Sequence, residues 1–328
     1  MTSTLLWVVA GSLGVLAAPA ASQGEPVAPA ALAVAAAFSL ERLLAEPPER
    51  LHPVAWFGRA VAPVDREWSH PLWVGTAVAV VCPLAAAGAV WTAIAAAGRV
   101  SPYAAAAVAG VTLFTTTSLR MLVDRANAVV DAASAQPGLA KQRLPALAGR
   151  DPSNLSPGHL RSAAVESAAE NLADGLVAPL FAFTVLAPLS LSLAGAGAAW
   201  VKSVNTLDSM LGYRSKPVGE PSARLDDLVM WLPARASAAL IALVATSPDP
   251  VLTARRWARV PDSPNSGWPI GTLASALGVR LEKPGAYELN PAASLPDRRQ
   301  AERGVRAVRH TGLLSYVIAA VLGVIAWL

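Results

Sequence analysis

The chain has 328 residues, of which 54% are hydrophobic and 15% charged, whereas soluble domains carry about 25% charged residues. This shortage of charge argues against an ordinary soluble domain and favours a protein embedded in a bilayer. The formal net charge is +4, but the basic residues are dispersed among loops without interleaved aromatics, which argues against nucleic-acid binding. The single cysteine, Cys82, excludes an intrachain disulfide or thiolate cluster, and we interpret it as a small core residue.

Long uncharged runs cover residues 1–24, 26–40, 72–97, 103–119, 176–201 and 311–328, and several reach the ~20 residues that a helix needs to span hydrocarbon. They predict an all-α, polytopic integral membrane protein that forms one membrane-embedded domain over residues 1–328. We divide it into N-terminal membrane helices (1–40), a core (41–247), a cytoplasmic loop (248–310) and a C-terminal membrane helix (311–328). The first run could be a signal peptide, but no basic residue precedes its apolar core, which favours a retained helix.

In chain order, the second helix ends before Pro47 and Pro48, and His52 follows with Pro53 behind it. A lone histidine is more often structural than functional, so His52 is a weak candidate for touching substrate. Residues 72–97 and 103–119 predict a helical hairpin. Beyond it, polar residues recur on one helical face, and a local ion pair is the simpler explanation of the first two: Arg120, Asp124, Asn127 and Asp131.

The stretch 149–178, GRDPSNLSPGHLRSAAVESAAENLADGLVA, begins as a loop broken by Pro and Gly and continues as a helix. Glu166, Glu170 and Asp174 follow at successive i,i+4 positions, which places three carboxylates in one stripe. Like charges so spaced repel each other. The stripe therefore indicates either a solvated helix face or a partner that is cationic.

The apolar run 176–201 is interrupted by Pro179, Pro188, Gly195 and Gly197. If this run crossed the membrane fully, the acidic stripe and the polar residues that follow the run would lie on opposite sides. We predict instead that the run folds back near Pro188, or that polar helices dip into the membrane to meet.

The next segment is dense in ionisable and amide side chains close to apolar runs, where such groups are costly and usually functional. They are Lys202, Asn205, Asp208, Arg224, Asp226, Asp227 and Arg235. The turn-rich residues 263–269, SPNSGWP, precede a short predicted amphipathic helix and are either a binding loop or a connector. The region from 255 to 309 is placed in the cytoplasm by eight arginines at its two ends: Arg255, Arg256, Arg259, Arg298, Arg299, Arg303, Arg306 and Arg309.

Several carboxylates beside several Arg and Lys residues are typical of a site for a Mg²⁺-bound polyphosphate. The sequence contains no GxxxxGK[ST] loop, no GxGxxG motif after a strand and no HExxH motif, so the usual nucleotide folds are not indicated. From the residues alone, the chain is a polytopic membrane enzyme or transporter with a charged site at the membrane surface.

Six ordered segments carry a resemblance to a known family: LHPVAWFGR, GRDPSNLS, ESAAENLADGLVAPLF, VNTLDSMLGY, ARLDDLVMWLPAR and SPNSGWP. Together they resemble the signature segments of the CobD/CbiB family, the adenosylcobinamide-phosphate synthases, over about residues 40–289. The chain departs from that pattern at Ala45, Glu46 and Pro47, where the family shows Gly-Asp-Pro, and in LEKPGAYEL near the end.

The resemblance implies a membrane ligase of cobalamin biosynthesis. It would join adenosylcobyric acid to (R)-1-amino-2-propanol O-2-phosphate, or to the free amino alcohol, as an amide at the corrin f propionate, with ATP consumed. Under this hypothesis Glu166, Glu170, Asp174 and Asp208 hold Mg²⁺ and ATP, with Glu170, Asp174 and Asp208 as metal ligands. The remaining candidates bind phosphates or other parts of the substrates: Arg150, Asp151, Asn171, Lys202, Asn205, Arg224, Asp226, Asp227, Arg235 and Asn265. His52 is the candidate acceptor of the amine proton.

The implied partners are the corrinoid, the amino alcohol phosphate and the lipid bilayer, with other membrane corrinoid enzymes or a second copy of the chain as further possibilities. The implied location is the inner cell membrane, with several crossings and a cytoplasmic active site. A transporter for a corrinoid or another anionic solute is the main alternative. A prenyl- or phosphoalcohol transferase is disfavoured because its paired DxxxD motifs are missing, and a noncatalytic scaffold is the least favoured reading.

Overall fold

The computed structural model describes residues 28–213 and 216–325. Within these ranges the chain is helical apart from one two-stranded hairpin, which confirms the expected helical architecture. The first helices are α2 (Pro29–Leu44), α3 (Pro53–Val61), α4 (Pro71–Gly98), α5 (Pro102–Thr116), α6 (Arg120–Ala135), α7 (Pro137–Arg143) and α8 (Pro157–Leu172). They are followed by α9 (Ala178–Leu186), α10 (Leu191–Leu211), α11 (Glu220–Val229), α12 (Trp231–Val244), α13 (Asp249–Ala254), α14 (Gly267–Leu277) and α15 (Arg298–Ile325). The prediction for residues 1–24 lies outside the described residues.

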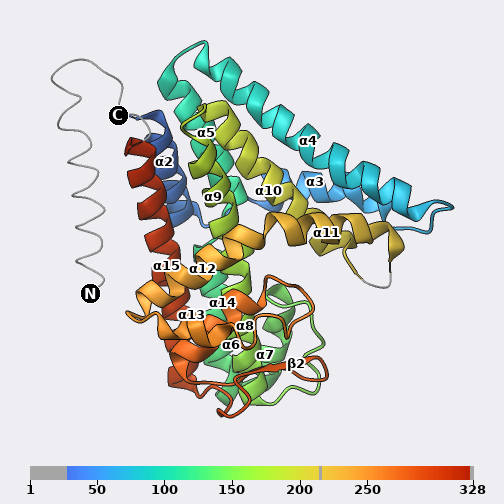
Figure 1. Cartoon of the computed structure of the whole chain (residues 1–328), viewed down its shortest axis with the longest axis vertical. Coiled ribbons are helices and arrows are strands. Elements are labelled where there is room, and N and C mark those ends of the chain that lie inside the picture. Colours follow the sequence, from blue (N-terminus) through green and yellow to red (C-terminus); the bar gives the residue numbers. More distant parts are fainter. Residues whose placement is uncertain (1–27, 214–215, 326–328) are drawn as a thin grey trace.

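The helices are arranged in two halves (Figure 1), and the sequences of these halves differ in composition. The apolar half contains α2, α4, α5, α9 and α10, and the polar half contains α6, α7, α8, α13, α14 and the hairpin, while α15 runs through both. In the described part of the chain, four helical stretches are long and apolar enough to cross a membrane, or five if the bent pair α11 and α12 counts as one. The protein is thus a polytopic helical membrane protein.

Helix α4 shows the character of the apolar half most clearly. Its uncharged sequence places large side chains outward, and Trp73 and Val81 are 79% and 61% exposed. Exposed apolar surface of this extent has no favourable contact in water. We therefore assign this face of α4 to lipid.

The apolar run 176–201 folds back as we predicted. Helix α9 ends at Leu186. Four residues later Ser190 caps α10 by accepting a hydrogen bond from the Leu193 N–H at 3.1 Å, and α10 returns along α9 (Figure 1). Pro188 lies in this reversal, where a helix could not have continued without losing a backbone hydrogen bond. The ends of α8 and α10 consequently meet at the boundary between the two halves.

Between α8 and α9 the chain forms one π-helical turn, Ala173–Val177, which contains Asp174. Such turns result from one extra residue in an α-helix and occur often at functional sites. The Gly175 carbonyl accepts the N–H of Ser118, at 2.9 Å, from the break between α5 and α6. The π turn is therefore tied to the neighbouring helix at the level where both change from apolar to polar.

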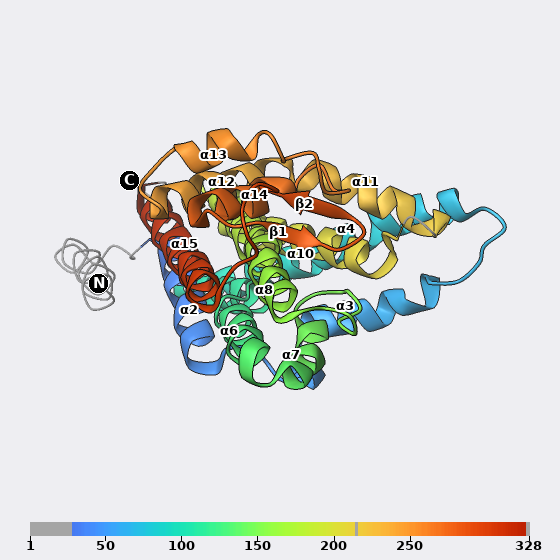
Figure 2. The ribbon, with the colours of Figure 1, turned by 90° about the horizontal axis from the view of Figure 1, so that it is seen from below.

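Helix α8 lies at the centre of the polar half, surrounded by α6, α7, α14, α15 and the hairpin (Figure 2). Ten of its sixteen residues are buried, and Glu166 is fully buried. The solvated-face reading of its acidic stripe is therefore wrong, because small alanines let neighbouring helices pack on every side.

Two features of the fold differ from the prediction. Helix α15 begins at Arg298 rather than near residue 311, so five of the eight arginines assigned to a loop lie on a helix. Its start is a capping box, in which Asp297 Oδ1 accepts the Gln300 N–H at 2.7 Å and Gln300 Oε1 accepts the Asp297 N–H at 2.9 Å. The hairpin of β1 (Leu281–Lys283) and β2 (Tyr287–Leu289) was also not expected.

Candidate functional site

A polar cavity of about 400 Å³ lies between α8, α10, the hairpin and the loop before α14. Its walls bring together seven of the residues that the sequence singled out: Arg150, Glu166, Glu170, Asn171, Asp174, Asn205 and Asp208. The lining also includes Ser263 and Ser266 of the SPNSGWP segment, and Lys283 and Tyr287, which the sequence analysis did not select. We call it the carboxylate cavity.

Local sequence explains how α8 presents its carboxylates. Ser156 caps the helix by accepting the His159 N–H at 3.3 Å, and Pro157 takes the first helical position, where its missing N–H costs nothing. The helix then runs without interruption into the π turn. As a result Glu166, Glu170 and Asp174 all reach one cavity, as their spacing predicted.

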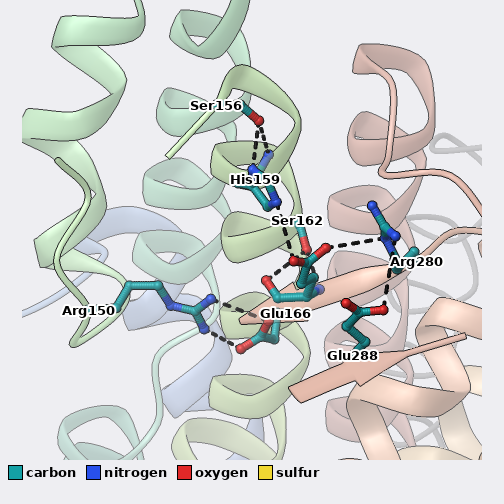
Figure 3. Close-up of polar contacts among 8 residues, drawn as sticks. Arg150, Ser156, His159, Ser162, Glu166, Arg280 and Glu288 are labelled. Atoms are coloured by element: carbon teal, nitrogen blue, oxygen red, sulfur yellow. Dashed lines mark hydrogen bonds and ion pairs between the residues drawn. The ribbon is translucent and has the colours of Figure 1, made fainter. Parts of the chain in front are cut away.

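Glu166 is held by two partners, of which Figure 3 shows Arg150. Arg150 forms an ion pair with its Oε1 atom and approaches Oε2 at 3.5 Å, and the Tyr287 hydroxyl donates to Oε1 at 2.6 Å. Burial by itself would lower the pKa of Arg150, but the adjacent Glu166 carboxylate outweighs it and raises the pKa. Burial and Glu166 also raise the pKa of Tyr287, which therefore remains a hydrogen-bond donor.

The hairpin is fixed on α8, which sets the position of its side chains. Ser162 Oγ accepts the Glu282 N–H at 2.8 Å, and the Glu282 carboxylate pairs with His159 at 3.5 Å and with Arg280 at 3.3 Å (Figure 3). Lys283 and Tyr287, on the two strands, are thereby placed over the cavity. Lys283 makes no ion pair or side-chain hydrogen bond with any residue that the structure describes.

The last two turns of α10 provide the opposite wall. Asn205 and Asp208 share a face at i,i+3, and both line the cavity. Asp208 lies outside the candidate membrane spans. Burial, and secondly the charge of Asp227, raise the pKa of the Asp208 carboxyl to about 6.

Helix α11 adds two carboxylates beside this wall. Asp226 is 8% exposed, and its Oδ1 atom has no hydrogen-bond partner. Asp227 accepts from the Ser263 hydroxyl at 3.3 Å, and the Asn265 amide donates to the Asp227 carbonyl at 2.7 Å. The SPNSGWP segment is thus more than a connector, because it holds α11 against the cavity.

Arg235 and Arg224 lie outside the cavity. Arg235 donates to Asn265 Oδ1 at 3.0 Å and stacks over Trp231 and Trp268 at 4.3 and 5.0 Å. Arg224 pairs with Glu220 at the surface, where its side chain is 78% exposed. The expectation that both contact substrate phosphates finds no support in their positions, since each guanidinium is directed to a protein partner instead.

Three other candidates are also absent from the cavity lining. His52 caps α3, where its Nδ1 accepts the Val54 N–H at 3.3 Å, and burial lowers its pKa. Lys202 lines a separate, mostly apolar cavity of about 290 Å³ together with Phe57. Asp151 is exposed and closes a turn by accepting from the Ser153 N–H at 2.9 Å and from its hydroxyl at 2.6 Å.

Sequence did hold a signal for Lys283 and Tyr287, although it was missed. They flank Pro284 and Gly285, a dipeptide that marks turns, and Gly285 adopts φ +76°. A three-residue hairpin loop with glycine in the left-handed region is a common connection. What the turn does not reveal is that the hairpin packs on a helix some 120 positions earlier in the chain.

The residues of the cavity fit a magnesium nucleotide. Among the described residues, no group of three or more His, Cys, Asp or Glu side chains is arranged to hold a metal ion by itself. Mg²⁺ that arrives with a nucleotide, however, needs only one or two carboxylates, since phosphates and water supply its other ligands. Glu170, Asp174 and Asp208 line one cavity, and Asp226, whose Oδ1 has no hydrogen-bond partner, lies beside Asp208, so these carboxylates offer the oxygen ligands that such an ion needs.

Comparison with known proteins identifies the family. A family model described as CobD/Cbib protein matches residues 34–311. The chain belongs to the CobD/CbiB family. The match includes every residue of the carboxylate cavity, and CobD/CbiB proteins are implicated by name in cobalamin biosynthesis.

Curated relatives agree with this assignment. A probable cobalamin biosynthesis protein CobD from Methanothrix thermoacetophila is 32% identical over 303 residues, 87% of this chain and 94% of the relative. Cobalamin biosynthesis protein CobD from Klebsiella pneumoniae is 36% identical over 274 residues, 78% and 83% of the two chains. Cobalamin biosynthesis protein CbiB from Salmonella choleraesuis is 34% identical over 275 residues, again 78% and 83%. No solved structure matches the chain.

Proposed function

We propose that this CobD/CbiB chain is an adenosylcobinamide-phosphate synthase, a ligase that forms a carbon–nitrogen bond. It joins adenosylcobyric acid to (R)-1-amino-2-propanol O-2-phosphate, or to aminopropanol, and consumes ATP with Mg²⁺. The single observation that carries the proposal is the convergence of Glu170, Asp174 and Asp208 with Lys283 in one cavity of a CobD/CbiB chain.

The reaction needs an activated carboxyl group, because a carboxylate resists attack by an amine. Transfer of the terminal phosphoryl group of ATP to the corrin propionate gives an acyl phosphate and ADP. The amine, after losing one proton to water, attacks the acyl carbon. Its second proton leaves with phosphate, so the products are the amide and hydrogen phosphate.

The cavity residues have separate tasks in this scheme. Lys283, whose ammonium forms no hydrogen bond or ion pair with the described residues, binds phosphate oxygens, and Arg150, which is paired with Glu166, adds positive charge. Glu170, Asp174 and Asp208 hold Mg²⁺, which would neutralise phosphate charge. His52 has no part in the scheme because it does not line the cavity.

The cavity has room for the reacting groups of the substrates but not for the whole corrinoid. At about 400 Å³ it lies within the ordinary range for small-ligand pockets, and a corrin ring with its side chains is far larger. The corrin therefore lies outside, with only its propionate entering. The cavity is lined by the ends of α8 and α10, where the polar and apolar halves meet, and this position suits a bulky, water-borne substrate that reaches the membrane surface.

Charge distribution supports a cytoplasmic site. The polar half carries the arginines of residues 255–309, which include those on the first turns of α15. Lys and Arg collect on the cytoplasmic side of membrane proteins. We accordingly place the carboxylate cavity on the cytoplasmic face of the cell membrane, where ATP is available.

A ligation assay tests the proposal. The purified full chain in detergent is given adenosylcobyric acid, aminopropanol phosphate, ATP and Mg²⁺, and the corrinoid product is identified by mass spectrometry. We expect adenosylcobinamide phosphate together with ADP, and no product when EDTA removes the metal. Asp174→Asn and Glu170→Gln, which preserve side-chain shape, are expected to lower turnover by at least about 100-fold, as removal of a catalytic electrostatic group does.

The matched control is Asp131→Asn, which removes an exposed carboxylate that is paired with Arg298 at 3.2 Å and does not line the cavity. It should keep full activity. Transport of intact adenosylcobyric acid into vesicles without ligation would instead support the transporter alternative. Full ligation by both cavity variants would contradict the metal-site assignment while leaving the ligase intact.

A further inference from the structure

A second polar cavity, of about 430 Å³, lies between α2, α6 and α15 and shares no lining residue with the carboxylate cavity. Its polar walls come from the C-terminal end of α2, the first turns of α6 and the middle of α15. They are Glu41, Arg42, Arg120, Asp124, Asn127 and Arg309. We call it the arginine cavity.

The arginine cavity lies at one level of the molecule, where three helical segments change from apolar to charged. Helix α2 is uncharged from Pro29 to Leu40, and Arg42 lies in its last turn. The apolar helix α5 gives way to α6 at Arg120, and α15 becomes uncharged directly after Arg309 and His310. Such a coincident change marks the boundary between hydrocarbon and water.

Most charges in its walls are compensated within the protein. Glu41 caps α6, because its Oε1 atom accepts the N–H groups of Leu119, at 2.8 Å, and of Arg120. Arg120 in turn donates to the carbonyls at the end of α2, at 2.7 Å to Arg42 and 3.4 Å to Leu43, and pairs with Asp124 at 3.7 Å.

Two cations make no such contact. In the described part of the chain, the Arg42 and Arg309 guanidinium groups form neither a hydrogen bond nor an ion pair, although the Glu41 carboxylate lies near Arg42. They come from helices that are neighbours in space and far apart in sequence, and both line the same cavity. An anion with oxygen acceptors is the ligand that would pair both at once.

We propose that the arginine cavity binds the headgroup phosphate of a net-anionic membrane phospholipid, such as phosphatidylglycerol. The phosphodiester accepts hydrogen bonds from Arg42 and Arg309, and headgroup hydroxyls donate to Asp124 or Asn127. A lipid fits better than a soluble phosphate because Leu313 lines the same cavity and Leu43 and Leu44, beside Arg42, are 76% and 60% exposed. Basic pockets between membrane helices are a known mode of anionic lipid recognition.

Native mass spectrometry of the full chain in detergent tests this inference. Palmitoyl-oleoyl phosphatidylglycerol is titrated against palmitoyl-oleoyl phosphatidylcholine, whose choline cancels the phosphate charge. We expect one tightly retained phosphatidylglycerol and at least about tenfold weaker phosphatidylcholine binding. Arg42→Gln and Arg309→Gln should each weaken phosphatidylglycerol binding by about tenfold, the usual consequence of losing one charge-assisted hydrogen bond.

Arg306→Gln is the matched control, because Arg306 lies on the same helix, outside the cavity lining, and approaches Glu302 at 3.9 Å. It should leave phosphatidylglycerol binding unchanged. Equal loss in Arg306→Gln, or equal retention of both lipids, would overturn the site. Binding of free glycerol 3-phosphate as tight as that of the lipid would overturn the lipid assignment, since the acyl chains would then contribute nothing. Melting temperatures of all variants, measured in the same detergent, show whether a loss of lipid reflects loss of folding.

Discussion

The ion pair of Arg150 and Glu166 is among the most enclosed charge interactions of the described chain, with side chains 10% and 0% exposed. Desolvation of two charges is costly, and their mutual attraction offsets it only while both partners are present. The pair therefore adds modest net stability but makes each partner indispensable to the other. Its position beside Glu170 also means that the geometry of the cavity depends on it.

Arg150→Ala should consequently destabilise the protein by about 3–5 kcal/mol, because Glu166 would remain buried with only Tyr287 as a partner. Thermal unfolding in detergent measures this effect. The double variant Arg150→Met with Glu166→Leu removes both charges and should recover most of the loss.

Arg224→Ala serves as the comparison. It breaks an exposed pair with Glu220, and such pairs contribute roughly 0–1 kcal/mol. An equal loss in Arg150→Ala and Arg224→Ala would show that the burial of Glu166 is energetically unimportant.

At the residue scale, the sequence predicted those site members that depend on helical spacing. Glu166, Glu170 and Asp174 follow from i,i+4 periodicity, and Asn205 with Asp208 from i,i+3. The hairpin residues could not be found this way, because the packing of β1 on α8 is a tertiary contact without local periodicity. For a related reason the sequence could not show that Arg224 and Arg235 lie outside the cavity, since the position of a charged residue in the chain does not reveal the direction of its side chain.

At the element scale, the start of α4 lies unusually close to the turn before α11. A Cβ atom built on Gly75 would lie 2.2 Å from the Val218 carbonyl oxygen, whereas one on Gly88, in the same helix, meets nothing within 4 Å. Small residues at contacts of this kind let helices and backbone approach closely inside a membrane protein.

Gly75→Ala is therefore expected to cost about 1–3 kcal/mol, since backbone rather than a side chain must move to make room. Gly88→Ala should cause no loss, and helix propensity alone favours alanine by about 1 kcal/mol. The difference between the two melting temperatures isolates the contact, because both changes add the same methyl group to one helix. Equal melting temperatures would contradict the close approach.

The accuracy of the element predictions varied with the hydrophobic pattern. The hairpin of α4 and α5 was predicted nearly residue by residue because its apolar runs end at sharp turns. Helix α15 was predicted too short, since its first part is charged and carries no apolar signal. Ion pairs at i,i+4, such as Arg298 with Glu302 at 2.8 Å, stabilise that part instead.

On the scale of the whole molecule, the reversal between α9 and α10 determines which surfaces face the same compartment. The chain leaves the polar half in α8, turns at residues 187–190 and returns through α10. Residues before α8 and after α10 should accordingly be accessible from one side of the membrane.

Cysteine labelling in a Cys82→Ser background measures this arrangement. Ser153→Cys and Ser209→Cys, both at exposed positions, should react with a membrane-impermeant maleimide from the same side of oriented vesicles. The labelling of these two positions is compared with that of Val100→Cys, which is 83% exposed. This residue lies in the turn between α4 and α5, at the far end of the apolar half (Figure 1). Labelling of Ser153→Cys and Ser209→Cys from opposite sides would exclude a shared site.

Two helical columns pass from the apolar half into the polar half without a break. One is α15, and the other consists of α8, the π turn and α9. One part of each column therefore lies in the half assigned to lipid, and the other part lies in the half exposed to water. Helices adjust to a thicker or thinner hydrocarbon layer by changing their tilt. A tilt of the α8 column would displace Glu166, Glu170 and Asp174 directly. A change in the thickness of the surrounding bilayer would therefore change the geometry of the carboxylate cavity.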